Sequence, residues 1–253
     1  MLALSVIIIT KDAACTIRRC LESVKWADEI IIFDSGSSDN TLEICAEYTP
    51  CVFVTDWPGF GLQKNRALCK ARGKWVLSID ADEELSGELI DEIKQIVNDS
   101  NVSEDAYHIK RISFFCGTKI KYGDWGSDTV IRFFKNKPTI QFSPVIVHEK
   151  IIGYGSLAYL KGTIFHYTIE NISQMLIKLE DYSAFGAKLG YQQGKKSSFL
   201  RAFMHGLWCF IRGYFIRFGF LDGREGFILA FTNAAGVFYR YIKLMYLYKT
   251  ECV

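Results

Sequence analysis

Hydrophobic and polar residues follow two alternating patterns in the N-terminal part of the chain. Short runs that are apolar on both faces predict strands buried inside a sheet. These runs are Ser5–Ile9, Glu29–Phe33, Val52–Thr55 and Trp75–Ile79. Apolar residues recur at the spacing of amphipathic helices in residues 14–24, 38–48, 63–70 and 88–97. Strands that alternate with helices predict an α/β fold, Rossmann-like, with a mostly parallel sheet covered on both sides.

The pattern changes in the second half of the chain. Further strands are expected near Ala106–Phe115, Val130–Phe134 and Thr139–Phe142. From about residue 170 the sequence has the character of long helices rich in aromatic residues. We therefore expect an α/β domain at residues 1–170 and a C-terminal helical region at residues 171–253.

Charge is distributed unevenly between these two parts. The formal net charge is only +2, which does not indicate a nucleic-acid-binding protein. Residues 195–249 nevertheless hold nine Lys or Arg against two Asp or Glu, together with nine of the 19 Phe. Basic and aromatic residues on short helices are typical of an element that lies on an anionic membrane surface. The alternative is a helical pair that packs on the first domain or across the interface of a homo-oligomer.

Three further features limit the possibilities. The eight cysteines include no C-x-x-C pair, so free thiols in a reducing cytosol are expected instead of a zinc or thioredoxin-like motif. The apolar stretch Leu2–Ile9 has no basic residue before it, so we expect a first strand and not a signal peptide. The uncharged stretch Phe227–Tyr239 has 13 residues, fewer than the roughly 20 that span a bilayer.

Polar clusters follow each of the four predicted parallel strands. In open α/β sheets, ligands bind at the carboxyl ends of the strands, which a parallel sheet brings to one edge. The clusters are Thr10-Lys11-Asp12, Asp34-Ser35-Gly36-Ser37, Asp56-Trp57 and Asp80-Ala81-Asp82. Their convergence predicts a ligand site at this edge of the sheet.

The acidic residues of these clusters suit a nucleotide and a metal ion. Asp80 and Asp82 offer the oxygen ligands that Mg²⁺ or Mn²⁺ prefers, and such an ion can bridge to phosphates. An acidic turn that caps a helix is the alternative. Asp34 can accept from a base N–H or a ribose hydroxyl, and Gly36 lets the backbone approach a ligand, although an ordinary turn uses the same residues.

A basic segment follows the Gly-containing loop at residues 57–61. The residues Gln63 to Arg66 open a helix, where cations are unfavourable unless an anion lies nearby. Lys64 and Arg66 can therefore neutralise a diphosphate. A solvated basic helix start is the alternative.

Together these segments resemble family 2 glycosyltransferases with the single-domain A-type fold. Within that family, the chain is similar to bacterial glucosyltransferases that add a β-linked sugar to the lipopolysaccharide inner core. The resemblance rests on LSVIIITKDA, CLESVKWADEIIIFDSGSSDNT, WPGFGLQKNRAL, GKWVLSIDADEEL, VIRFFKN, VHEKI and GFLDGREGF. It covers nearly the whole chain.

The resemblance implies roles for particular residues. Thr10 and Asp34 would hold the uracil and ribose of a UDP-sugar, Lys64 or Arg66 would contact its phosphate or sugar, and Asp82 would bind the divalent cation. The polar clusters at the strand ends and the family resemblance together predict the residues that contact the nucleotide sugar. These are Thr10, Lys11, Asp12, Asp34, Ser35, Gly36, Gln63, Lys64, Arg66 and Asp80. The expected ligands of Mg²⁺ or Mn²⁺ are Asp82, Asp80 and His166.

One part of the family pattern is missing. No late Glu-Asp or Asp-Asp pair supplies a catalytic base, and Val147-His148-Glu149 falls where that pair is expected. Glu149 is therefore the first candidate for the base, and Asp124 is the second. For either His148 or His166, a structural role is the alternative to metal binding.

The resemblance implies an inverting, metal-dependent transfer of a sugar, glucose, from a UDP-sugar to a lipid-linked saccharide, with the lipopolysaccharide inner core as acceptor. The expected location is cytoplasmic, on the inner face of the bacterial inner membrane. The first alternative is a catalytically silent nucleotide-sugar-binding or scaffold protein of the same fold. A nucleotidyltransferase is disfavoured, because Thr10-Lys11-Asp12-Ala13 lacks a Gly-rich, basic signature.

Overall fold

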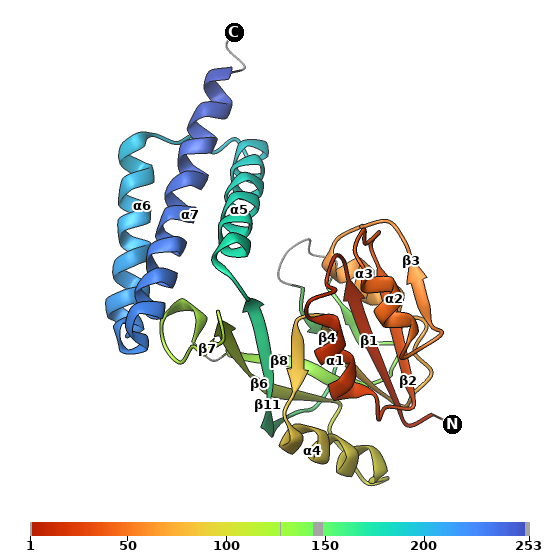
Figure 1. Cartoon of the computed structure of the whole chain (residues 1–253). Coiled ribbons are helices and arrows are strands. Elements are labelled where there is room, and N and C mark those ends of the chain that lie inside the picture. Colours follow the sequence, from red (N-terminus) through yellow and green to blue (C-terminus); the bar gives the residue numbers. More distant parts are fainter. Residues whose placement is uncertain (1, 127, 144–148, 251–253) are drawn as a thin grey trace. The chain divides into compact units, whose positions relative to one another are not determined.

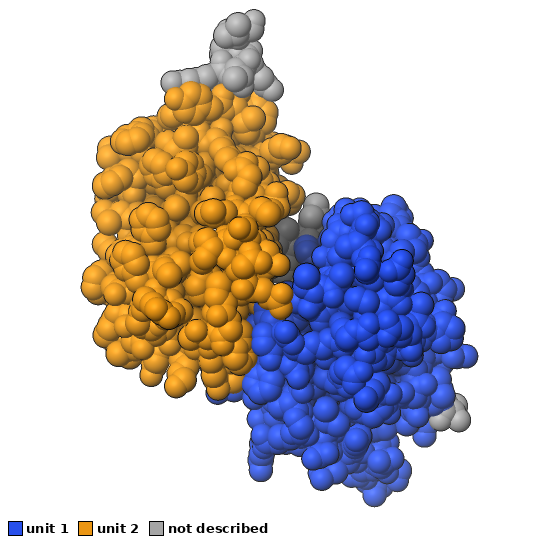
Figure 2. Space-filling view, viewed as in Figure 1, with its two compact units in different colours: residues 1–111, 128–167 blue, residues 112–127, 168–253 orange. Residues whose placement is uncertain are grey.

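The computed structural model describes residues 2–126, 128–143 and 149–250 (Figure 1). For residues 249 and 250 it describes the backbone alone. The chain divides into two compact units, shown in different colours in Figure 2. Unit 1 comprises residues 1–111 and 128–167, and unit 2 comprises residues 112–127 and 168–253.

The main sheet begins with four parallel strands, in the order β3-β2-β1-β4. Their bounds are Leu4–Thr10 for β1, Glu29–Asp34 for β2, Val52–Val54 for β3 and Trp75–Asp80 for β4. Each coincides with a predicted apolar run to within a few residues. The α/β class and the parallel sheet are therefore confirmed.

Later strands extend this sheet from β4, in the order β8-β6-β11-β5. The strand pairs β4–β8, β6–β8 and β11–β5 are antiparallel. The bounds are Glu83–Leu85 (β5), Ala106–Phe115 (β6), Asp128–Lys135 (β8) and Leu157–Ile169 (β11). Short strands β7 (Thr118–Lys119), β9 (Gln141–Phe142) and β10 (Ile151–Ile152) complete the set, β7 beside β6 and β9 paired with β10. The predicted later strands are thus present.

The sheet of unit 1 is covered on both faces because its strands are apolar on both faces. On β1, Val6 and Ile8 belong to one core cluster, whereas Ile7 and Ile9 belong to the other. The first cluster includes residues of α1 (Ile17–Val24), α2 (Thr41–Ala46) and α4 (Gly87–Asn98), and the second includes residues of α3 (Phe60–Leu68), β9 and β10. The four parallel strands are therefore held between two hydrophobic clusters, and their carboxyl ends lie at the same edge of the sheet.

Unit 2 is mainly helical, as the aromatic-rich sequence predicted. Its elements are η1 (Gly123–Trp125), α5 (Ile172–Gln192), α6 (Phe199–Ile211), η2 (Arg212–Ile216), η3 (Gly219–Asp222) and α7 (Gly223–Thr250). Figure 1 shows α5 and α6 on either side of the long helix α7. No helix in the described part of the chain combines the length and the hydropathy needed to cross a bilayer.

Candidate active site

The carboxyl ends of the parallel strands meet at one edge of the sheet. Thr10 pairs with Asp34 across β1 and β2, and Ile9 pairs with Asp80 across β1 and β4. The backbone N–H of Thr55, just after β3, donates to the carbonyl of Asp34 (2.9 Å). Residues far apart in the sequence are therefore neighbours here, as the parallel sheet predicted.

One side of this edge offers polar groups around an accessible backbone. The buried amide of Gln63 donates to the hydroxyls of Ser35 (3.2 Å) and Thr55 (2.8 Å). The buried Thr10 hydroxyl has no hydrogen-bond partner among the described residues. At Gly36, which has φ +83°, no atom lies within 4 Å of where a Cβ would be. An unpartnered hydroxyl beside an open stretch of backbone suits a polar ligand.

Asp34 is more deeply buried than the sequence suggested. We expected it at a ligand-facing rim outside the core, but its relative exposure is 0%. Its Oδ1 accepts from the N–H groups of Gly36 (2.8 Å) and Ser37 (2.7 Å), and its Oδ2 accepts from the Ser37 hydroxyl. Asp34 therefore lies at the end of β2 as expected, but it is buried there and its carboxylate holds the turn. Loss of this carboxylate would weaken the turn as well as any contact with a nucleotide.

The remaining residues of these clusters lie at the surface. Lys11 is exposed, and the exposed Asp12 accepts from the backbone N–H of Ser38 (2.7 Å). Arg66 pairs with the exposed Asp56 at 2.9 Å. These side chains can reorient toward a ligand at little cost, since exposed ion pairs contribute little stability.

A buried ion network lies at the end of β4. The ammonium of Lys64, on α3, is 2.8 Å from Asp80 Oδ1 and 2.7 Å from Glu149 Oε1. The Lys64 side chain is only 2% exposed. A Cβ at Gly61 would lie 2.1 Å from the Ser143 carbonyl oxygen and 3.5 Å from Glu149 Cβ. The glycine therefore lets α3 approach Ser143 and Glu149 closely. The structure thus brings together the predicted residues Lys64, Asp80 and Glu149.

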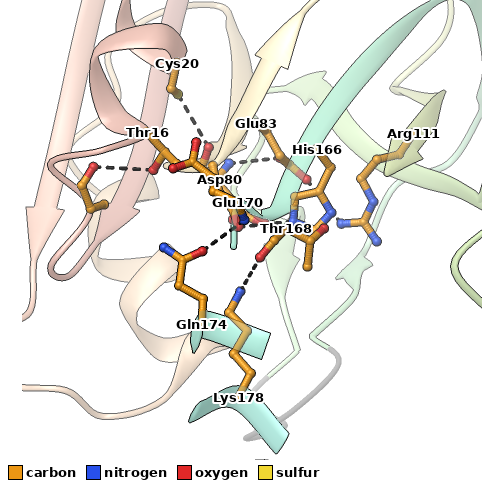
Figure 3. A network of polar contacts seen from close by, with 12 residues as sticks. Thr16, Cys20, Asp80, Glu83, Arg111, His166, Thr168, Glu170, Gln174 and Lys178 are labelled. Atoms are coloured by element: carbon orange, nitrogen blue, oxygen red, sulfur yellow. Dashed lines mark hydrogen bonds and ion pairs between the residues drawn. The ribbon is translucent and has the colours of Figure 1, made fainter. Parts of the chain in front are cut away.

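Two residues that sequence reasoning missed complete the network. Arg132, on β8, forms ion pairs with Asp80 and with Glu83 Oε1 (3.1 Å). Glu83 Oε2 accepts from the Asp80 backbone N–H at 2.9 Å (Figure 3). A charged residue inside the apolar strand VIRFFKN was the available signal for Arg132. Glu83 was considered only as a possible helix cap.

The network keeps Asp80 ionised. Burial by itself would raise the pKa of Asp80, but the charges of Arg132 and Lys64 outweigh burial and hold that pKa well below its usual range. Burial likewise opposes the charge of Arg132, yet Asp80 and Glu83 raise its pKa above the ordinary value. At neutral pH, Asp80 is therefore a carboxylate fixed by two cations.

Asp82 and His166 lie together beyond this network. His166 Nε2 is 3.3 Å from Asp82 Oδ2, and the Tyr167 N–H donates to the Asp82 carbonyl (2.8 Å). Burial lowers the pKa of His166, but the hydrogen bond and charge of Asp82 outweigh it, so that this pKa is raised. Asp80 is turned instead toward Lys64 and Arg132.

Of the three predicted metal ligands, Asp82 and His166 lie together, whereas Asp80 faces Lys64 and Arg132. Across residues 2–126, 128–143 and 149–250, no group of three or more His, Cys, Asp or Glu is placed to hold a metal ion. The pair Asp82 and His166 nevertheless offers one oxygen and one nitrogen donor. Mg²⁺ is often held by one or two carboxylates, with substrate phosphates as further ligands, and imidazole suits several transition metals. The donor chemistry therefore fits a cation that a diphosphate helps to bind, whereas His148 lies outside the described residues.

Asp124, the second candidate for the base, lies in unit 2. Its oxygens pair with Arg212 (3.0 Å) and Arg217 (2.6 Å). Both oxygens are therefore already engaged by cations, whereas at Glu149 one oxygen, Oε1, pairs with Lys64.

Comparison with known proteins gives the family. The model for glycosyl transferase family 2 matches residues 5–143. The chain belongs to this family, and it is a glycosyltransferase.

Several known proteins are similar to this chain. An uncharacterized glycosyltransferase of Rickettsia prowazekii is 34% identical over 255 residues, covering 96% of this chain and 87% of its own. The lipopolysaccharide core biosynthesis glycosyltransferase LpsC of Rhizobium meliloti is 26% identical over 256 residues, covering 95% and 93%. The crystal structure of S. aureus TarS 1–349 in complex with UDP has a TM-score of 0.48 at 16% identity, covering 98% of this chain and 91% of its own.

Proposed function

We propose that this glycosyltransferase transfers glucose, with inversion, from UDP-glucose to a lipid-linked saccharide of the lipopolysaccharide inner core. The observation that carries the proposal is the buried Lys64, which joins Asp80 and Glu149 at the carboxyl ends of the parallel strands. The similarity to the lipopolysaccharide core biosynthesis glycosyltransferase LpsC of Rhizobium supports the choice of acceptor.

The proposed donor site uses both sides of the strand edge. The free hydroxyl of Thr10 and the open backbone at Gly36 would receive the uridine. The exposed Lys11 and the half-buried Arg66 would neutralise the diphosphate. Asp80, held as a carboxylate by Lys64 and Arg132, would accept a hydrogen bond from a ribose or sugar hydroxyl.

Asp82 and His166 would hold a Mg²⁺ or Mn²⁺ ion, with the diphosphate oxygens as further ligands. When bound, that ion supplies positive charge that stabilises the departing diphosphate.

Glu149 is the proposed catalytic base. The acceptor hydroxyl oxygen attacks the anomeric carbon, a new C–O bond forms, and the bond from that carbon to the phosphate oxygen breaks with its electron pair going to UDP. The hydroxyl proton passes to the Glu149 carboxylate. Lys64 keeps this carboxylate 2.7 Å from its ammonium and thereby fixes its position beside Asp80.

A screen of donors would test the nucleotide-sugar part of this proposal. Full-length protein with Mn²⁺ is melted alone and with UDP-glucose, UDP-N-acetylglucosamine, GDP-mannose or ADP-glucose. At a hundredfold excess over its Kd, the true donor should add about 2.7 kcal/mol, which raises Tm by roughly 5–10 °C. UDP-glucose is expected to give the largest rise. A rise without any release of UDP in the presence of acceptor would favour the silent binding protein.

The proposed location at the cytoplasmic face of a membrane is supported by the helix α6. Its small residues Ala202, Gly206 and Cys209 are buried, and a Cβ at Gly206 would lie 3.2 Å from the Ala234 carbonyl oxygen of α7. Its large apolar residues are 41–69% exposed: Phe199, Leu200, Phe203, Met204, Leu207 and Trp208. A helix in water normally has the reverse arrangement. This exposed face, with basic residues nearby, suits a peripheral contact with anionic lipid.

We expect the full-length protein to sediment with phosphatidylglycerol vesicles and to leave phosphatidylcholine vesicles largely alone. Each basic residue near an anionic surface contributes about 1 kcal/mol. Added salt should weaken binding without abolishing it, because salt screens the charges but not the apolar contact. The double variant Phe203→Ser/Trp208→Ser should bind less, whereas Tyr159→Ser, which removes an exposed aromatic of unit 1, should not. Protein that stays in the supernatant at low salt would assign this face to a protein interface.

A further inference from the structure

Unit 2 contains a cavity that the transfer reaction does not use. Its volume is about 580 Å³, within the range of small-molecule sites, and its lining residues come from η1, β11, α5, α6, η2 and α7. Part of the wall is apolar, with Met175 and Leu179 from α5 and Leu229 and Val237 from α7. All of the lining residues belong to unit 2, whereas the residues proposed to bind the donor belong to unit 1.

The charged residues of the lining are mostly cations. Lys178, Arg212, Arg217 and Arg240 line the cavity, and Asp124 is the one acidic residue among its lining residues. Asp124 pairs with Arg212 and Arg217 at 3.0 and 2.6 Å. Because one carboxylate faces four cations, the lining keeps an excess of positive charge.

Some donor groups of these cations are not paired with a carboxylate in the described part of the chain. The buried Nε of Arg212 has no hydrogen-bond partner there. Lys178 donates to the Thr168 carbonyl at 2.8 Å, and within the described residues neither Lys178 nor Arg240 forms an ion pair. The Arg240 guanidinium lies 5.0 Å from the centroid of the Tyr241 ring. Partly buried cations without counter-ions are unfavourable unless an anion joins them.

We propose that this cavity binds the phosphate-bearing head of an amphiphile, with the phosphate against Arg240 and Lys178 and the apolar part against Met175, Leu179 and Val237. Guanidinium groups bind phosphate oxygens through paired hydrogen bonds, and the apolar wall excludes water from them. Such a site takes one molecule per protein, unlike the diffuse attraction of a charged membrane surface. A phospholipid and a phosphorylated saccharide lipid share this chemistry.

Calorimetric titration of the full-length protein tests this site. The probes are dihexanoylphosphatidic acid below its micelle concentration, dihexanoylphosphatidylcholine with the same chains, and inorganic phosphate without chains. We expect one equivalent of phosphatidic acid to bind at least about tenfold more tightly than either of the others, because only it offers both the charge and the chains. Equal affinity for phosphatidic acid and phosphatidylcholine would overturn the proposal, and binding of inorganic phosphate as tight as that of phosphatidic acid would show a free-phosphate site instead.

Variants locate the binding in the cavity. Arg240→Met should weaken phosphatidic acid binding about tenfold. Arg224→Met removes the same charge from the same helix at an exposed position outside the cavity, and it should bind like wild type. If both variants bind alike, the cavity is not the site.

A second cavity variant keeps all the charges. At Gly236 the only atom near a new Cβ would be Leu179 Cγ at 3.8 Å, so Gly236→Leu would fill the cavity. Its binding should be lost even if Arg240→Met fails to fold. Retained binding in Gly236→Leu would contradict the proposal. Both variants should still bind UDP like wild type, because neither substitution is in the proposed donor site. UDP titration of the same samples therefore shows whether a loss of binding is confined to the cavity.

Discussion

Glu149→Gln is expected to lower kcat by about 10²–10⁴-fold, with little change in KM for the donor. A base takes its proton in the transition state, so its loss appears in kcat. The amide keeps the size of the side chain and can still accept from Lys64, which is 2.7 Å from Glu149 Oε1 in the structure. Steady-state kinetics with the donor identified by the screen measures both constants.

The matched comparison is Asp124→Asn, which changes the other candidate carboxylate in the same way. Its oxygens pair with Arg212 and Arg217, so we expect an effect on the stability of unit 2 and a much smaller change in kcat. If Asp124→Asn is inactive while Glu149→Gln retains wild-type turnover, the base is Asp124.

Lys64→Met should destabilise unit 1 by about 3 kcal/mol and abolish transfer. Removal of one partner from a buried ion pair leaves uncompensated charge, which costs roughly 3–5 kcal/mol. The lower end applies because Asp80 keeps Arg132 as a partner and is 28% exposed. Thermal melts should show a fall in Tm of roughly 6–12 °C.

Arg66→Met is the control, on the same helix two residues away. Arg66 forms its ion pair with the exposed Asp56 and also donates to the side-chain oxygen of Gln63 (3.2 Å), so its loss should cost less than the loss of the buried Lys64, about 1 kcal/mol. A Lys64→Met variant that melts like wild type would show that the network does not stabilise the site.

The parallel half of the fold could be predicted because its signal is local. Each of the four strands is a run of apolar residues, and each ends in a polar cluster, as at Thr10 and Asp80. The meeting of these ends then follows from parallel pairing alone. Lys64 was singled out because the sequence placed it at the start of a helix, where cations are unusual. In the structure α3 begins earlier, at Phe60, so Lys64 lies in its second turn.

The rest of the site depends on contacts between distant residues. Glu83 looked like part of an acidic turn, but β5 pairs with β11, so that His166 lies opposite Glu83 and next to Asp82. This antiparallel pairing joins residues some 80 positions apart, so no local pattern in the sequence predicts it. The burial of Arg132 and Asp34 likewise depends on partners that propensity and spacing do not reveal.

The measurement that tests the central claim most directly is the calorimetric titration of UDP into wild-type protein and Asp82→Ala, each with Mn²⁺ and with EDTA. The exposed carboxylate variant Asp128→Ala serves as a control. The proposed donor site predicts that Mn²⁺ tightens UDP binding to wild type and Asp128→Ala at least about tenfold, and that Asp82→Ala loses this gain. Equal affinity for UDP with EDTA and with Mn²⁺ in the wild type would contradict the account.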